Sequence, residues 1–162
     1  ERFNYCSKLR GKEMLKGIDP LLNADVLRVL RAMGHGDDLI ITDTNFPSDS
    51  VARQTVYGSL LRIDASAADV VQAVLSVMPI DTFVDDAAAR MEVVDEPKTI
   101  LPVMTEVQDK VSAVDGPNHM LPIERFSFYD RAKNAYALIQ TGERRFYGCF
   151  AFRKGVIGPD GE

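Results

Sequence analysis

The sequence predicts a single α/β domain in which helices flank a mixed β-sheet. Two observations support this fold class: apolar residues recur at helical spacing in several segments, and short β-branched runs alternate with those segments. A chain of 162 residues suits one domain with one hydrophobic core. We expect the domain to span residues 14–157, with residues 1–13 as an N-terminal extension and residues 158–162 as a loose C-terminal tail.

The first half of the chain carries signals for two helices and two strands. Asn23 suits the N-cap of the first helix, and Gly34 lies at the expected C′ position. The runs 39–42 and 57–63 have the apolar, β-branched character of strands. Ser66 begins the second helix as in a capping box, with aspartate in the usual glutamate place. Pro79 is expected to end this helix. Its expected buried face consists of Val70, Val71, Val74, Leu75 and Met78.

The second half is expected to hold two helices and three strands. Four valines at positions 103, 107, 111 and 114 recur at helical spacing after Pro102, and Gly116 with Pro117 is expected to end that helix. The remaining elements are a strand at 90–94, a helix at 123–134, and strands at 135–140 and 147–153 that follow one another through a turn at 141–143.

Composition excludes several classes of partner. The net charge is −5, with basic and acidic residues interspersed, so the basic stripe of a nucleic-acid-binding protein is missing. No apolar run approaches the ~18 residues of a membrane span. Cys6 and Cys149 are too few and too far apart for a disulfide framework or a zinc site, which favours the reducing cytoplasm. The sequence motifs of phosphate, dinucleotide, serine-hydrolase and zinc-protease sites are also missing, so we expect no cofactor and no metal.

Two residues near the first predicted strand are candidates for a site. His35 lies between two glycines, and imidazole titrates near neutrality, which suits proton transfer. The alternative is a histidine that only bonds the last carbonyls of the preceding helix. Asp43 lies near the carboxyl end of the run 39–42, where α/β sheets usually bind ligands. It could equally form a turn ahead of Asn45 and Pro47, and the spacing leaves both pairs of alternatives open.

Further candidates lie in the second half of the chain. Arg125, Tyr129 and Arg131 share a predicted helix, where packing and surface ion pairs are the commoner roles. Cys149 lies in an apolar run and is by residue type most often a small core residue. A histidine together with a tyrosine or a carboxylate can move protons on a small polar substrate without a cofactor.

Four motifs resemble those of the L-fucose mutarotases in the RbsD/FucU family. They are MGHGDD at 33–38, DTNFP at 43–47, IERFSFYDRA at 123–132, and TGE at 141–143 followed by Tyr147 and Gly148. The resemblance implies an RbsD-like fold and a cofactor-independent isomerase that interconverts the α and β anomers of L-fucose. Ring opening and closure need a base for the anomeric hydroxyl and an acid for the ring oxygen.

The resemblance also implies roles for individual residues. His35 and Tyr129 are the expected proton-transfer pair. The expected substrate-binding residues are Asp43, Asp81, Arg125, Tyr147, Gly148 and Cys149. Cys149 departs from the pattern because the family has asparagine there, and a thiol forms weaker hydrogen bonds than an amide.

Assembly and specificity follow from the same resemblance. Family members form rings of eight to ten subunits with active sites at the subunit boundary, so we expect a homo-oligomeric ring, an octamer or a decamer. The segment 125–129 is of the fucose type, which favours L-fucose over D-ribose. Two alternatives remain: a non-catalytic sugar-binding or transport-accessory protein, and a D-ribose pyranase.

Overall fold

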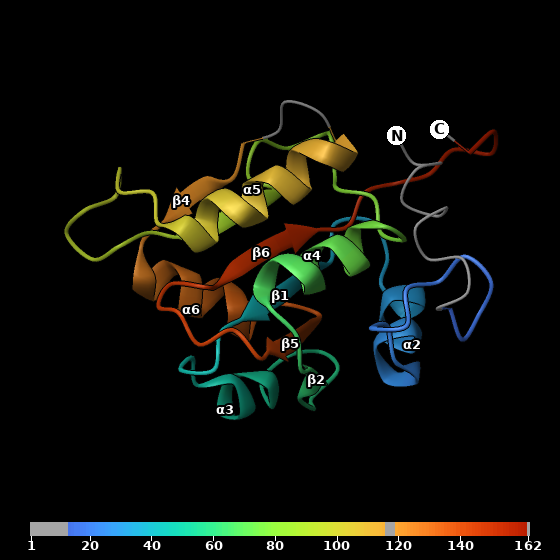
Figure 1. Ribbon diagram of the computed structural model, residues 1–162, viewed down its shortest axis with the longest axis horizontal. Helices are drawn as coiled ribbons and strands as arrows, with labels where there is room; N and C mark the ends of the chain where they lie inside the picture. Colours follow the sequence, from blue (N-terminus) through green and yellow to red (C-terminus); the bar gives the residue numbers. More distant parts are fainter. Residues whose placement is uncertain (1–12, 116–118, 162) are drawn as a thin grey trace.

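A six-stranded mixed sheet with helices on both faces forms the centre of the computed structural model, which describes residues 13–115 and 119–161 (Figure 1). The strands are β1 (Asp38–Thr42), β2 (Leu61–Ile63), β3 (Ala88–Met91), β4 (Leu121–Ile123), β5 (Ala137–Thr141) and β6 (Phe150–Arg153). Their order is β2-β5-β1-β6-β3-β4. β6 is antiparallel to both of its neighbours, whereas the other pairs are parallel. The predicted fold class is therefore confirmed.

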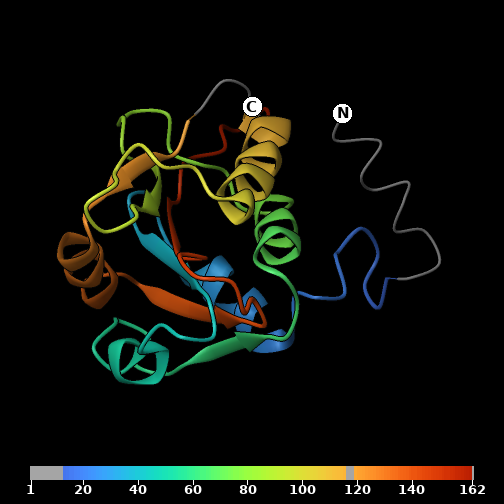
Figure 2. The same cartoon turned by 60° about the vertical axis from the view of Figure 1, so that its left-hand side comes forward.

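Two helical layers cover the sheet, and the side chains of the central strands alternate between them. The helices are α2 (Ala24–Ala32), α3 (Ser48–Ala52), α4 (Ala67–Leu75), α5 (Pro102–Asp115) and α6 (Arg125–Lys133). Leu39 and Ile41 of β1 belong to the core formed with α2, α4 and α5, while Ile40 belongs to the core formed with α3 and α6. Figure 2 shows α4 and α5 on one side of the sheet and α6 on the other. This alternation is the period of two that a strand buried on both faces requires.

Two of the predicted helix starts are confirmed by their caps. The Asn23 side chain accepts a hydrogen bond from the Val26 amide at 3.0 Å, and Ser66 caps α4 in the same way. Gly34 follows the C-cap of α2 as predicted, but the left-handed glycine is Gly36, at φ +88°. The longest described helix, α5, has 14 residues, and no described helix has the length and apolar character to cross a bilayer. The predicted helix stop at 116–117 lies outside the described residues.

Two elements were not predicted. α3 follows Pro47, where the sequence indicated only a turn, and its buried Ser48 hydroxyl lies 2.8 Å from the Thr42 hydroxyl. β4 occupies the place where the helix 123–134 was expected to begin. Pro122 is tolerated there because β4 is an edge strand. The Glu124 carboxylate then accepts hydrogen bonds from the first amides of α6, so the helix begins later than predicted.

Three predicted strand limits differ from the structure by three residues or more, each near a residue with left-handed backbone. β2 was expected to begin at 57 but begins after Gly58, whose φ is +75°. β3 ends at 91 instead of 94, ahead of a turn in which Asp95 has φ +62°. β6 begins at 150 instead of 147, because Tyr147 has φ +60°. A positive φ interrupts the extended conformation that pairing requires. Of these three residues, only Gly58 adopts such a φ without a steric cost.

An ionic network attaches α6 to the start of β1. The carboxylate of Asp38 accepts two hydrogen bonds from Arg131 and two from Arg153, all between 3.0 and 3.2 Å. Arg153 also donates to Asp86 at 2.9 Å. The Asp38 and Arg131 side chains are both 12% exposed, so solvent screens this pair only weakly. The network therefore fixes the end of the sheet at which β1 begins.

Replacing Asp38 tests this network. We expect Asp38→Ala to lower the free energy of unfolding by about 3 kcal/mol, because two partly buried guanidinium groups lose their shared carboxylate. Asp49→Ala, which breaks an exposed ion pair with Arg53, should cost only about 0.3 kcal/mol. Urea denaturation measures both values. Equal losses in the two variants would contradict this account.

Candidate active site

A cavity of about 260 Å³ lies at the carboxyl end of β1. Five predicted site residues line it: Asp43, Arg125, Tyr129, Tyr147 and Cys149. Its apolar lining comes from Phe46, Met91 and Phe146, which the sequence analysis did not single out. The volume is just below the ~300 Å³ at which pockets for drug-sized ligands begin, so it suits a small ligand.

The buried carboxylate of Asp43 organises one wall of this cavity. Its Oδ1 accepts hydrogen bonds from the amides of Asn45 and Phe46, both at 2.9 Å, so Asp43 forms the turn that the spacing left as one of two alternatives. Its Oδ2 accepts from the Gly148 amide at 3.1 Å and from the Cys149 thiol at 3.5 Å. The turn after β1 and the loop before β6 are therefore held together by one side chain that is only 4% exposed.

Cys149 keeps its proton in this setting. The thiol is buried, and both this burial and the negative charge of Asp43 raise the pKa of Cys149 well above its usual range. The thiol can therefore donate to Asp43, although S–H is a weak donor. Of the four donors on Asp43, the thiol is the one that a ligand hydroxyl could replace at the least cost.

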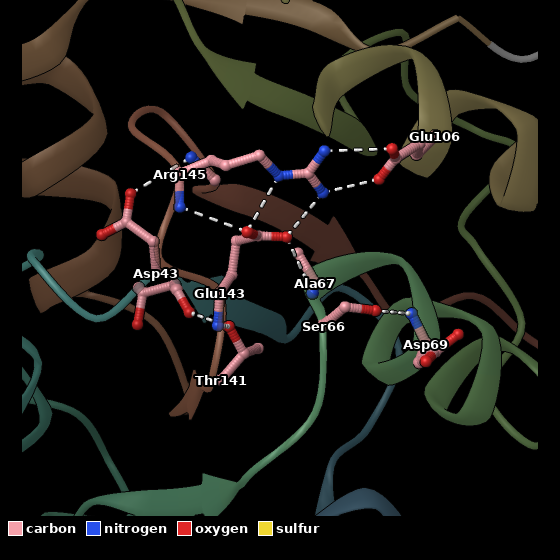
Figure 3. Close-up of polar contacts among 10 residues, drawn as sticks. Asp43, Ser66, Ala67, Asp69, Glu106, Thr141, Glu143 and Arg145 are labelled. Carbon is pink, nitrogen blue, oxygen red and sulfur yellow. Dashed lines mark hydrogen bonds and ion pairs between the residues drawn. The ribbon is translucent and has the colours of Figure 1, made fainter. Parts of the chain in front are cut away.

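The loop between β5 and β6 carries Tyr147, which lines the cavity, and Gly148, which does not line it but donates its amide to Asp43. The Tyr147 hydroxyl accepts a hydrogen bond from the Val94 amide at 3.3 Å. A Cβ at Gly148 would lie 2.9 Å from Cγ of Glu143 and 3.3 Å from Cβ of Asp43, so only glycine fits between these two side chains. In Figure 3 the Glu143 side chain lies between Asp43 and the ion pair of Arg145 with Glu106.

Helix α6 supplies the opposite wall. Arg125 and Tyr129 are one helical turn apart, and the Arg125 Nε donates to the Tyr129 hydroxyl oxygen at 3.2 Å. This hydrogen bond raises the pKa of Arg125. The Tyr129 ring also packs against Phe46, with 5.1 Å between ring centroids. Because the Tyr129 oxygen accepts from arginine, the tyrosine proton is free to be donated to a ligand in the cavity.

The other two predicted site residues form a second cluster. His35 Nε2 lies 3.2 Å from Oδ1 of Asp81, whose carboxylate is buried and also accepts from the Phe83 amide at 3.1 Å. Burial raises the pKa of Asp81, but the hydrogen bonds from Phe83 and His35 outweigh burial and hold that pKa below its usual value. Asp81 is therefore an anion at neutral pH, and it orients the imidazole.

The carbonyls at the end of α2 are capped by Lys154, whereas the hydrogen bond of His35 is to Asp81. The Nζ of Lys154 donates to the carbonyl oxygens of Leu30 and Met33 at the end of α2, at 2.8 and 2.5 Å. These carbonyls therefore have a partner other than the imidazole. The His35 ring instead meets the exposed ring of Phe83 edge to face, with centroids 5.4 Å apart.

The two clusters lie at opposite ends of β1. His35 precedes the strand and Asp43 follows it. The antiparallel strand β6 begins beside Asp43, after Cys149, and ends beside the other cluster, where the carbonyls of Arg153 and Lys154 accept from the amides of Asp81 and Gly36. The five residues of β1, at about 3.3 Å each, make a strand roughly 16 Å long. One copy of the chain therefore does not bring His35 and Tyr129 to the same small ligand.

Comparison with known proteins identifies the family. The model of the RbsD / FucU transport protein family matches residues 16–157. The chain belongs to the RbsD/FucU family. A fucose mutarotase of Danio rerio is 38% identical over 155 residues, which are 91% of this chain and 97% of that relative.

Two solved structures with similar folds agree with this assignment. A crystal structure of a protein provisionally described as sugar-binding is 58% identical, with a TM-score of 0.88, and the match covers 91% of this chain and 99% of that one. The fucose mutarotase of Streptococcus pneumoniae, solved in complex with L-fucose, is 31% identical with a TM-score of 0.80. That match covers 89% of this chain and all of the other.

Several residues at or near the site could not be predicted from the sequence, because their roles depend on packing or on partners far away in the chain. Phe46 and Met91 are buried apolar residues whose place on the cavity side of the sheet depends on strand order. Phe83 lies two residues after Asp81, is 70% exposed and packs against the ring of His35, a contact that no local sequence pattern predicts. Arg145 and Glu106 are 39 residues apart, and no local pattern predicts their ion pair.

Asp43→Asn tests the role of the buried carboxylate. In the asparagine variant an NH2 group replaces one of the two carboxylate oxygens. In one orientation it faces the Gly148 amide, and in the other it faces the amides of Asn45 and Phe46, so at least one backbone donor loses its acceptor. We expect the free energy of unfolding to fall by about 2 kcal/mol. Urea denaturation checks this value, with Asp109→Asn, an exposed position on α5, as the control. Equal stability of Asp43→Asn and the unmodified protein would contradict the role assigned to Asp43.

Proposed function

We propose that the protein interconverts the α and β anomers of L-fucose. The observation that carries this proposal is the Arg125–Tyr129 pair: both residues line a small cavity with a partly apolar lining, and the Tyr129 oxygen accepts a hydrogen bond from Arg125, which leaves its proton for a ligand. The relatives named fucose mutarotase, and the relative solved with L-fucose, support the choice of sugar.

In this mechanism Tyr129 and His35 are the two proton-transfer groups. Ring opening removes the proton of the anomeric hydroxyl and adds one to the ring oxygen, and closure on the other face reverses both transfers. Arg125 stabilises negative charge on the Tyr129 oxygen. Asp81 stabilises positive charge on the imidazole of His35.

The remaining residues bind and orient the sugar. Arg125 presents donors to sugar oxygens, and a sugar hydroxyl could replace the Cys149 thiol on Oδ2 of Asp43. Tyr147 forms the adjacent wall, and the Gly148 amide holds the Asp43 carboxylate in place. Phe46 and Met91 offer an apolar surface to the C–H face and the methyl group of a 6-deoxy sugar.

The complete site needs two copies of the chain. His35 of one copy meets the cavity of another in this proposal, because the two clusters of one copy lie at opposite ends of the sheet. Exposed aromatic residues lie at both clusters: Phe83 beside His35, and Phe126 and Phe146 around the cavity, each at least 68% exposed. In this proposal the neighbouring copy covers these aromatic residues. A head-to-tail contact gives a ring when the rotation from copy to copy closes, and a closed ring is the assembly proposed here.

A second candidate is a sugar-binding protein without catalysis. Cys149 at the position of the family's asparagine favours it, as does the 58%-identical relative provisionally described as sugar-binding. Such a protein would keep Asp43 and Arg125 but would have no use for the His35–Asp81 pair.

Exchange between the anomers of L-fucose, measured by saturation-transfer NMR, tests the proposal. We expect the protein to accelerate exchange, and His35→Ala to reduce that acceleration roughly 100-fold, because one of two proton-transfer groups is lost. His119→Ala, which removes the other histidine of the chain, is the matched control. Binding of L-fucose with exchange at the spontaneous rate would establish the sugar-binding protein instead.

A further inference from the structure

Arg145 joins two carboxylates that belong to different parts of the fold. Its Nε and Nη2 donate to Glu143 in the same loop at 3.0 and 2.9 Å. Its Nη1 and Nη2 donate to Glu106 of α5 at 3.0 and 2.6 Å. Figure 3 shows the guanidinium group between the two acids. We call these three residues the Arg145 clamp.

Glu143 connects the clamp to three other segments. Its carboxylate, only 6% exposed, also accepts from the Ala67 amide at the start of α4 and from the Arg145 amide. Its backbone carbonyl accepts from the Thr44 amide at 2.8 Å, and its own amide donates to the Thr141 hydroxyl. Hydrogen bonds from Arg145 lower the pKa of Glu143, so this buried acid stays charged and needs its cation.

The clamp is one of two anchors for the segment that forms the cavity wall. Residue 145 is held by Glu143, and residue 148 is held by Asp43. Between these anchors lie Phe146 and Tyr147, which line the cavity, and Tyr147 has a strained φ of +60°. A non-glycine residue keeps such a backbone conformation only where its surroundings enforce it.

We propose that Arg145 is a positioning residue for the sugar site, an inference that rests on the proposed function. It does not line the cavity, and it acts by fixing residues 146–149. Bidentate arginine–carboxylate pairs combine strength with fixed geometry, so loosening this pair displaces Tyr147 and Cys149 relative to Arg125 and Tyr129. Displacements of about 1 Å in a catalytic site lower rates by up to roughly 100-fold.

Charge reversal at Glu106 tests the clamp from its exposed end. In Glu106→Lys a cation faces Arg145 from a solvent-exposed position of α5, which leaves the core intact. We expect kcat/KM for L-fucose exchange to fall roughly tenfold. Asp109→Lys, the same charge change at an exposed position of the same helix, should leave kcat/KM unchanged.

Variants of Arg145 and the thiol of Cys149 give an independent measurement. Arg145→Gln should lower kcat/KM at least as much as Glu106→Lys, and Arg145→Lys should recover part of the loss because an ammonium group can still pair with Glu143. In a Cys6→Ser background, Cys149 is the remaining thiol. Its reaction with a thiol reagent should accelerate in Arg145→Gln and in Glu106→Lys, well below their melting temperatures, because residues 146–149 move away from Asp43.

The outcomes separate this inference from the proposed function. If the unmodified protein does not accelerate anomer exchange, the proposed function fails, and thiol reactivity still decides whether the clamp fixes the loop. Lower melting temperatures with unchanged kcat/KM and unchanged thiol reactivity would overturn the inference and leave Arg145 a purely structural role. If Arg145→Gln does not fold, Glu106→Lys decides by the same two measurements.

Discussion

The carboxylate of Asp43 is the interaction on which the cavity depends. Four donors from two segments more than 100 residues apart in the sequence converge on its two oxygens. Backbone amides in a buried place need acceptors, and a charged acceptor satisfies several of them at once. Asp43 directly follows the carboxyl end of the inner strand β1, and the turn after β1 and the loop before β6 take their positions from its carboxylate.

The antiparallel strand β6 explains why the functional groups fall into two clusters. Because β6 runs against β1, the loop that enters β6 joins Asp43, while the residues that leave β6 join His35 and Asp81 at the other end. Each cluster has the same internal design, in which a potential proton-transfer group is held by a side chain of complementary charge: Tyr129 by Arg125, and His35 by Asp81. Neither cluster alone contains both groups that ring opening requires.

The sequence predicted what local patterns determine. Asn23 and Ser66 cap their helices as expected, because capping involves residues three positions apart. The short strand β4 could not be predicted, since its proline is acceptable only at a sheet edge, and edges are defined by strand order. For the same reason the sequence left the role of His35 open: its partner Asp81 lies 46 residues away, and Lys154 takes the helix carbonyls that the imidazole could have capped. The spacing likewise left the turn role of Asp43 open. Its bond with the Gly148 amide could not be predicted, because residue 148 is far away in the sequence.

The central claim is that His35 and Tyr129 of different copies act on one sugar, and subunit mixing tests it most directly. His35→Ala and Tyr129→Phe would each be inactive alone, and the two variants would be co-expressed with different tags and purified as mixed assemblies. If each site takes His35 from one copy and Tyr129 from its neighbour, random mixing restores about one quarter of the unmodified exchange rate. Mixed assemblies as inactive as the two separate variants would contradict the account.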